Sequence, residues 1–64
     1  MKQQREWLKQ IRTSKGMTQT EVAIKGGFAR SYYTMVESGN RTPSVNMAKQ
    51  IGKILDFDWY KFFE

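Results

Sequence analysis

The chain has 64 residues with no cysteine and no histidine, which excludes a disulfide and a Cys/His zinc site. One domain over residues 1–64 must therefore be stabilised by packing alone, close to the lower size limit for such a core. No apolar run exceeds three residues, which excludes a membrane-spanning helix and a signal-peptide core. We expect a cytoplasmic protein with no membrane partner.

The net charge of +5 is unevenly distributed along the chain. Residues 1–41 carry eight basic and three acidic side chains, whereas residues 42–64 carry three of each, so the first segment holds the entire excess. Such an asymmetry suggests a polyanionic partner. A basic surface that only favours solubility explains the same charge equally well, and the charge alone leaves both explanations open.

The first expected helix covers residues 3–14. Trp7, Leu8 and Ile11 have helical spacing, and Gly16 is placed to end the helix. A second helix is expected to follow at once.

Residues 18–39 have the layout of two short helices joined by a glycine-containing turn. Thr18 followed three residues later by Glu21 is the capping-box pattern, and it predicts a helix over Gln19–Lys25 with Val22 and Ala23 facing inward. Gly27 suits a turn residue with positive φ, and a further helix over Arg30–Ser38 would end at Gly39. This arrangement is a helix-turn-helix.

The remaining residues predict two more helices. Pro43 disfavours helix at the residue before it, and Ser44 is placed to cap a fourth helix that Asp56 ends. Its expected inward stripe consists of Val45, Ala48, Ile51, Ile54 and Leu55. A last, aromatic helix over about 58–63 would be capped by Asp58. The predicted fold class is all-α, with five helices and no strand.

Four segments together resemble a known family: Met17–Ala23, Gly27–Tyr33, Val36–Gly39 and Arg41–Val45. In this order and spacing they are similar to the lambda-repressor-like helix-turn-helix domains of Cro- and C1-type proteins, the XRE family. The resemblance extends from Arg12 to Leu55. It implies a compact five-helix domain whose second and third helices form the helix-turn-helix.

The resemblance also implies a structural ion pair and exposes two departures from the family pattern. An arginine near the end of the first helix pairs in this family with a glutamate near the end of the third, and Arg12 and Glu37 match those positions. Ala29 stands where a capping Ser or Thr is usual, and Asp56 stands where the family commonly has glycine after the fourth helix. The departures affect a cap and a turn, and neither lies at a base-contacting position.

The family geometry places one face of the third helix over DNA base edges. Arg30 suits guanine, Ser31 a base or a phosphate, and Met35 a thymine methyl group. Tyr32 and Thr34 are further candidates, and for Tyr32 a thymine contact, a phosphate contact and packing on the second helix are equal alternatives. The predicted base-reading residues are Arg30, Ser31, Tyr32, Thr34 and Met35.

Phosphate contacts are expected at the ends of the same two helices. The start of the second helix carries the partial positive charge of its dipole, and Gln19 there matches a family position that binds the DNA backbone. The segment after the third helix lies where flanking phosphates would pass. The predicted phosphate-binding residues are Lys15, Thr18, Gln19, Asn40, Arg41 and Thr42.

Four aromatic residues in the last six positions suggest a homodimer. A core of this size has room for about two of them, and exposed aromatic patches commonly mark interfaces. The predicted dimer interface consists of Trp59, Tyr60, Phe62 and Phe63. The alternative is that this segment folds back into its own core.

These residues predict a sequence-specific, double-stranded DNA-binding transcriptional regulator. Repression of phage, mobile-element or bacterial genes through a palindromic operator suits a short chain without an activation or sensing segment. The alternative is a protein-interaction module or antitoxin-like adaptor with the same fold. An enzyme is rejected because the sequence has no His or Cys, no phosphate-cradling glycine loop and no suitable carboxylate pair. No cofactor and no metal are expected.

Overall fold

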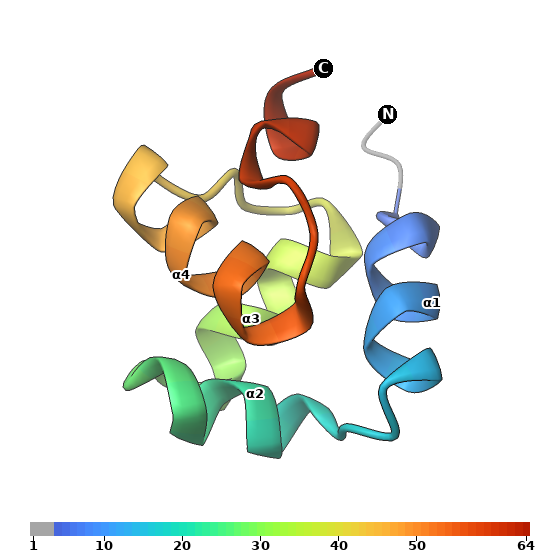
Figure 1. Cartoon of the computed structure of the whole chain (residues 1–64). Helices are drawn as coiled ribbons and strands as arrows, with labels where there is room; N and C mark the ends of the chain where they lie inside the picture. Colours follow the sequence, from blue (N-terminus) through green and yellow to red (C-terminus); the bar gives the residue numbers. More distant parts are fainter. Residues whose placement is uncertain (1–3) are drawn as a thin grey trace.

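The computed structural model describes residues 4–64 as four α-helices followed by a short 3₁₀ helix, without a strand in that range (Figure 1). The elements are α1 (Glu6–Ser14), α2 (Gln19–Gly26), α3 (Arg30–Ser38), α4 (Val45–Leu55) and the 3₁₀ helix η1 (Trp59–Phe63). The all-helical class is confirmed, but the count of five α-helices is wrong by one. None of the described helices is long and apolar enough to cross a membrane.

The last element is a short 3₁₀ helix without a side-chain cap. The Lys61 amide donates to the Asp58 carbonyl three residues earlier at 3.0 Å. The Asp58 carboxylate, which was expected to cap the helix, instead accepts a hydrogen bond from the Tyr60 hydroxyl at 3.1 Å. Three residues per turn place Trp59 and Phe62 on the same side, where both pack on the core.

Helix α1 begins later than predicted. Residue 3, where the predicted helix starts, lies outside the described residues, and Gln4 and Arg5 are described but are not helical. The Arg5 amide donates to the Glu37 carbonyl at 2.8 Å, so the chain is held against the end of α3 before α1 starts.

The corner between α2 and α3 depends on two glycines for different reasons. Gly27 adopts φ 72°, which confirms the predicted left-handed turn residue. A Cβ atom on Gly26 would lie 2.0 Å from Cε2 of Phe28. The Phe28 ring therefore occupies the space that any side chain at position 26 would need.

Most of the helix ends follow their local sequence. The Thr18 hydroxyl accepts from the Glu21 amide at 3.1 Å and the Glu21 carboxylate accepts from the Thr18 amide at 2.9 Å, which confirms the capping box. Ala29 precedes α3 without a side-chain cap. Asp56 adopts φ 60°, so the turn after α4 keeps the left-handed conformation that the usual glycine would have.

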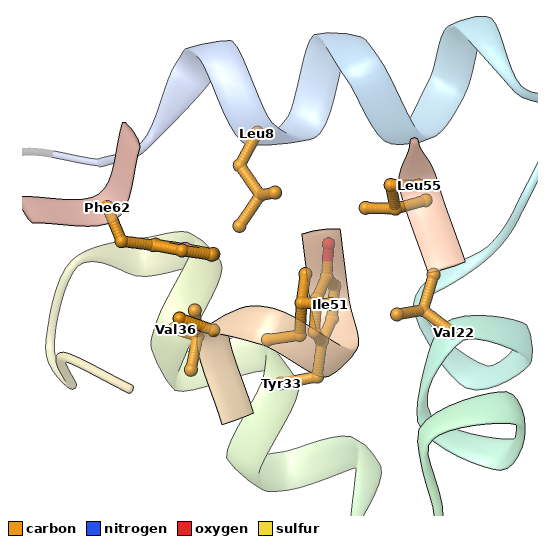
Figure 2. Close-up of a cluster of buried hydrophobic side chains, with 8 residues drawn as sticks. Leu8, Val22, Tyr33, Val36, Ile51, Leu55 and Phe62 are labelled. Atoms are coloured by element: carbon orange, nitrogen blue, oxygen red, sulfur yellow. The ribbon is translucent and has the colours of Figure 1, made fainter. Parts of the chain in front are cut away.

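The core collects between one and three apolar side chains from every element (Figure 2). Its buried members are Leu8, Val22, Tyr33, Val36, Ala48, Ile51, Leu55 and Phe62. The predicted stripe of α4 is correct except at its first residue, because Val45 is 49% exposed. Val45 is the first residue of α4, and η1 packs against a later part of this helix.

Candidate nucleic-acid interface

Helix α3 presents one polar face to solvent and one face to the core. Tyr33, Val36 and Glu37 are buried. Four of the five predicted base-reading residues lie together on the other side, where they line a single open hollow: Arg30, Ser31, Thr34 and Met35. Within residues 4–64 no hydrogen bond or ion pair engages the side chains of Arg30 and Ser31. Both are therefore available to a ligand.

Tyr32 is separated from this hollow. Its ring meets the Phe28 ring edge-on, with 5.7 Å between centroids, and the Arg41 guanidinium lies 5.5 Å from its centroid on the ring face. The tyrosine therefore lies between the α2–α3 corner and the segment after α3. Tyr32 therefore does not line the hollow that the other four residues share.

The start of α2 lies against α3 through the side chain of Gln19. Its amide nitrogen donates to Glu37 Oε1 at 3.1 Å, and its amide oxygen accepts from the Thr34 hydroxyl at 2.8 Å. Thr18 precedes it as the N-cap. Gln19 and Thr18, predicted for phosphate contact, therefore lie beside the outward face of α3.

The segment Asn40–Thr42 is exposed and is held by hydrogen bonds of its own backbone. The amides of Asn40 and Arg41 donate to the Met35 carbonyl at 3.0 and 3.2 Å, after Gly39 has turned the chain with φ 85°. Their side chains are thus placed at the end of α3, as predicted.

Arg5 is a residue that the sequence analysis missed. Its guanidinium donates to the carbonyls of Val36 at 2.6 Å and Arg41 at 3.0 Å, and it lies 5.5 Å from the centroid of the Phe62 ring. Partial burial lowers its pKa. A cation that caps the last carbonyls of a helix also interacts favourably with the helix dipole. No local pattern could reveal this role, because the partners are 31 and 36 residues away in the sequence.

Lys15, predicted for phosphate contact, lies beside an acidic side chain. Its ammonium lies 3.6 Å from the Asp56 carboxylate, and both side chains are solvent-exposed. The expected interaction with DNA would compete with this ion pair, which screening makes weak.

The predicted partners Arg12 and Glu37 form a buried ion pair with two hydrogen bonds. Arg12 Nε donates to Glu37 Oε2 at 2.6 Å and Arg12 Nη2 to Oε1 at 3.2 Å. Arg12 Nη1 also donates to the Met17 carbonyl at 2.8 Å. The pair therefore joins α1, the α1–α2 loop and the base of α3.

The surroundings of this pair shift two pKa values. Burial raises the pKa of Glu37, but the hydrogen bonds from Arg12 and Gln19 outweigh burial, and the pKa lies below its ordinary value. Burial, together with the nearby Glu37 carboxylate, raises the pKa of Tyr33 far above its usual range. The Tyr33 hydroxyl nevertheless makes no hydrogen bond of standard geometry.

The structure divides the four aromatic residues of the predicted dimer interface. Phe62 belongs to the core and cannot form part of an interface, so its assignment is wrong. The three-residue period of η1 turns it inward beside Trp7, whose ring centroid is 5.2 Å away. Trp59 is half-buried, whereas Tyr60 and Phe63 are 52% and 46% exposed.

Comparison with known families places this geometry in one class. The family model described as "Helix-turn-helix" matches residues 8–62. The chain therefore belongs to the helix-turn-helix family, with an XRE-type fold, and its class is that of DNA-binding transcriptional regulators.

Two curated relatives carry the same description. The chain is 55% identical over 60 residues to the uncharacterized HTH-type transcriptional regulator YqaF of Bacillus subtilis (strain 168), covering 94% of this chain and 79% of that protein. It is 36% identical over 45 residues to the uncharacterized HTH-type transcriptional regulator y4dJ of Sinorhizobium fredii (strain NBRC 101917 / NGR234), covering 70% of this chain and 58% of that one.

Solved structures of SinR have the same fold. A crystal structure of SinR, the master regulator for biofilm formation, in complex with DNA is 30% identical with a TM-score of 0.80, covering 92% of this chain and 95% of that one. The N-terminal DNA-binding domain of SinR from Bacillus subtilis matches with the same score and identity, covering 87% of that chain.

Proposed function

We propose that this protein represses transcription of phage, mobile-element or bacterial genes by occupying a palindromic operator as a homodimer. The observation that carries the proposal is the outward face of α3, where Arg30 and Ser31 have no partner among residues 4–64 and share a hollow with Met35. The similar SinR fold in complex with DNA supports it. Repression needs only that the protein covers a promoter.

Each residue of the hollow offers different chemistry to the major groove. Arg30 can donate two hydrogen bonds to O6 and N7 of guanine. Ser31 can donate to a base or a phosphate, and Met35 offers its thioether to a thymine methyl group. A cation, a hydroxyl and an apolar side chain on one short helix face can recognise a base sequence. A surface that offered only positive charge would bind every sequence alike.

Contacts with the DNA backbone would come from residues on both sides of the outward face of α3. Gln19 and Thr18 lie at the start of α2, where free amides and the helix dipole favour an anion. Arg41, stacked on Tyr32, lies at the other side after α3. Two such contacts would orient α3 on the duplex while carrying no sequence information themselves.

Selection of bound duplexes from a random pool, followed by affinity measurements over a salt series, tests this proposal. We expect log affinity to fall linearly with log salt concentration. Arg30→Ala should relax the preference at one base pair, worth about 1–3 kcal/mol of discrimination. Arg41→Ala should weaken all duplexes alike.

Lys53→Ala is the matched control, because it removes one exposed positive charge from α4 instead of α3. If Arg30→Ala left the selected sequence unchanged, the assignment of α3 as the base-reading helix would be wrong. The alternative of a protein-interaction module would then explain the exposed aromatic residues better.

The dimer would form through the exposed part of the aromatic segment. The rings of Trp59 and Phe63 are 6.1 Å apart, and the Lys49 ammonium lies 5.3 Å from the Trp59 centroid. Val45, one turn before Lys49, adds an exposed aliphatic side chain on the same side of α4. A two-fold axis through this patch would place two copies of α3 about 34 Å apart along the DNA.

Analytical ultracentrifugation with and without operator DNA tests the dimer. We expect Phe63→Ser to shift the protein towards monomer without unfolding it, because Phe63 is 46% exposed. Lys61→Ser, at an exposed neighbouring position, is the control. A wild-type protein that stays monomeric at micromolar concentration in both conditions refutes the dimer.

A further inference from the structure

A hydrogen-bonded chain of four side chains connects the buried ion pair to the outward face of α3. Arg12 donates to Glu37 at 2.6 Å, Gln19 donates to Glu37 at 3.1 Å, and the Thr34 hydroxyl donates to Gln19 at 2.8 Å. This series of hydrogen bonds begins at the buried Arg12 and ends at the exposed Thr34. Both ends of the Gln19 amide are held by residues of α3, the nitrogen by Glu37 and the oxygen by Thr34.

The contact with Glu37 specifies the orientation of the Gln19 amide, and the contact with Thr34 is compatible with it. A carboxylate oxygen only accepts, so the amide nitrogen must face Glu37. The amide oxygen then faces Thr34, whose hydroxyl donates to it. A rotated amide would bring its oxygen against the Glu37 carboxylate and would lose that hydrogen bond, even though the Thr34 hydroxyl could accept from the rotated nitrogen. The Gln19 side chain is therefore held in one arrangement before any ligand is present.

This arrangement leaves one N–H of the Gln19 amide without an acceptor among residues 4–64. The amide nitrogen has two hydrogens, and one is donated to Glu37. The second lies at the start of α2, where the dipole of an eight-residue helix also favours an anion. A flexible glutamine would lose rotamer freedom when it bound a phosphate, whereas this one has already lost that freedom on folding.

We propose that Thr34 is a positioning residue for the phosphate contact of Gln19, and that it does not itself read a base. Its hydroxyl hydrogen is used by Gln19, so a hydrogen bond donated to a base would have to break that contact. This inference rests on the proposed DNA-binding function and changes the role expected for Thr34 from the sequence. It predicts an effect on affinity that is the same for every base sequence.

The test compares Thr34→Val, Thr34→Ser and Gln19→Ala by fluorescence anisotropy with labelled duplexes. Thr34→Val should weaken binding of all duplexes by about three- to tenfold, the range expected when one side chain must be ordered on binding. Thr34→Ser keeps the hydroxyl and should bind like the wild type. The slope of log affinity against log salt should not change, because no charge is lost.

A double variant separates positioning from an independent contact. In the Gln19→Ala background, Thr34→Val should cause no further loss, since the group that it positions is gone. Thr13→Val is the matched control, because the Thr13 hydroxyl is exposed and donates only to Gln10 in its own helix. Circular dichroism should give similar melting temperatures for Thr34→Val and the wild type.

Specific outcomes overturn the inference and show which claim has failed. A changed preferred base with Thr34→Val would make Thr34 a base-reading residue and leave the proposed function intact. Additive losses in the double variant would mean that Thr34 and Gln19 act independently. An unchanged affinity with Gln19→Ala would show that Gln19 makes no phosphate contact. A wild-type protein that binds no duplex would refute the proposed function as well.

Discussion

The inward and outward faces of α3 differ in how their polar groups are satisfied. On the inward side, Glu37 accepts hydrogen bonds from Arg12 and Gln19. On the outward side, Arg30 and Ser31 are exposed, and no protein partner engages their side chains within residues 4–64. The hydrogen bonds of Glu37 hold the helix in place, whereas Arg30 and Ser31 remain available to a ligand. Substitutions on the two faces should therefore affect different measurements.

The largest expected effect is the loss of the buried carboxylate. Glu37→Ala leaves Arg12 charged and largely buried without its partner, which should lower the free energy of unfolding by about 3–5 kcal/mol. Urea denaturation followed by circular dichroism measures it. Glu21→Ala is the control, since that carboxylate is exposed and only completes the cap of α2. Equal losses for the two variants would contradict the comparison.

The pH dependence of stability should report the same carboxylate. The pKa of Glu37 is lower in the folded protein than its ordinary value of 4.5. Its contribution to stability is therefore complete above the ordinary value and is lost as the pH falls through the lowered folded pKa. Urea midpoints measured between pH 7 and pH 3 should fall more steeply for the wild type than for Glu37→Gln. Parallel curves would show that Glu37 is not responsible.

A smaller effect of opposite sign is expected at the start of α3. Ala29 occupies the N-cap position with an extended backbone, φ −72° and ψ 143°, but offers no side-chain acceptor. Ala29→Ser should raise the free energy of unfolding by about 1 kcal/mol. Thermal unfolding measures the gain, and Ala29→Gly tests whether the hydroxyl is responsible. A gain equal to that of glycine would attribute the effect to the backbone.

The smallest effect on folding should come from the outward face. Arg30→Ala should change the free energy of unfolding by no more than about 0.5 kcal/mol, because the side chain is exposed and makes no hydrogen bond or ion pair within residues 4–64. The same urea series serves as the measurement. A loss comparable to that of Glu37→Ala would mean that the two faces are not separate in function.

Local sequence predicted the parts of the fold that depend on neighbouring residues. The capping box of Thr18 and Glu21 and the positive φ of Gly27 and Gly39 each follow from a few adjacent positions. The fold class follows from the helical spacing of the apolar residues. The predicted boundaries of α3 agree with the structure residue for residue.

Contacts between residues that are far apart in the sequence could not be predicted from local patterns. Arg12 and Glu37 are 25 residues apart, and only the family resemblance suggested that they meet. Gln19 and Thr34 are 15 residues apart, and nothing in the sequence indicated their hydrogen bond. Phe62 and Phe63 are chemically identical neighbours, so only the 3₁₀ register decides which one is buried.

The corner at Gly26 and Phe28 has a practical consequence for protein engineering. The Phe28 ring fills the space beside Gly26, and neither residue lies in the open hollow. Arg30, Ser31 and Met35 can then be randomised in a library while this corner is kept constant. The domain is thus a small, cysteine-free scaffold on which new operator preferences can be selected.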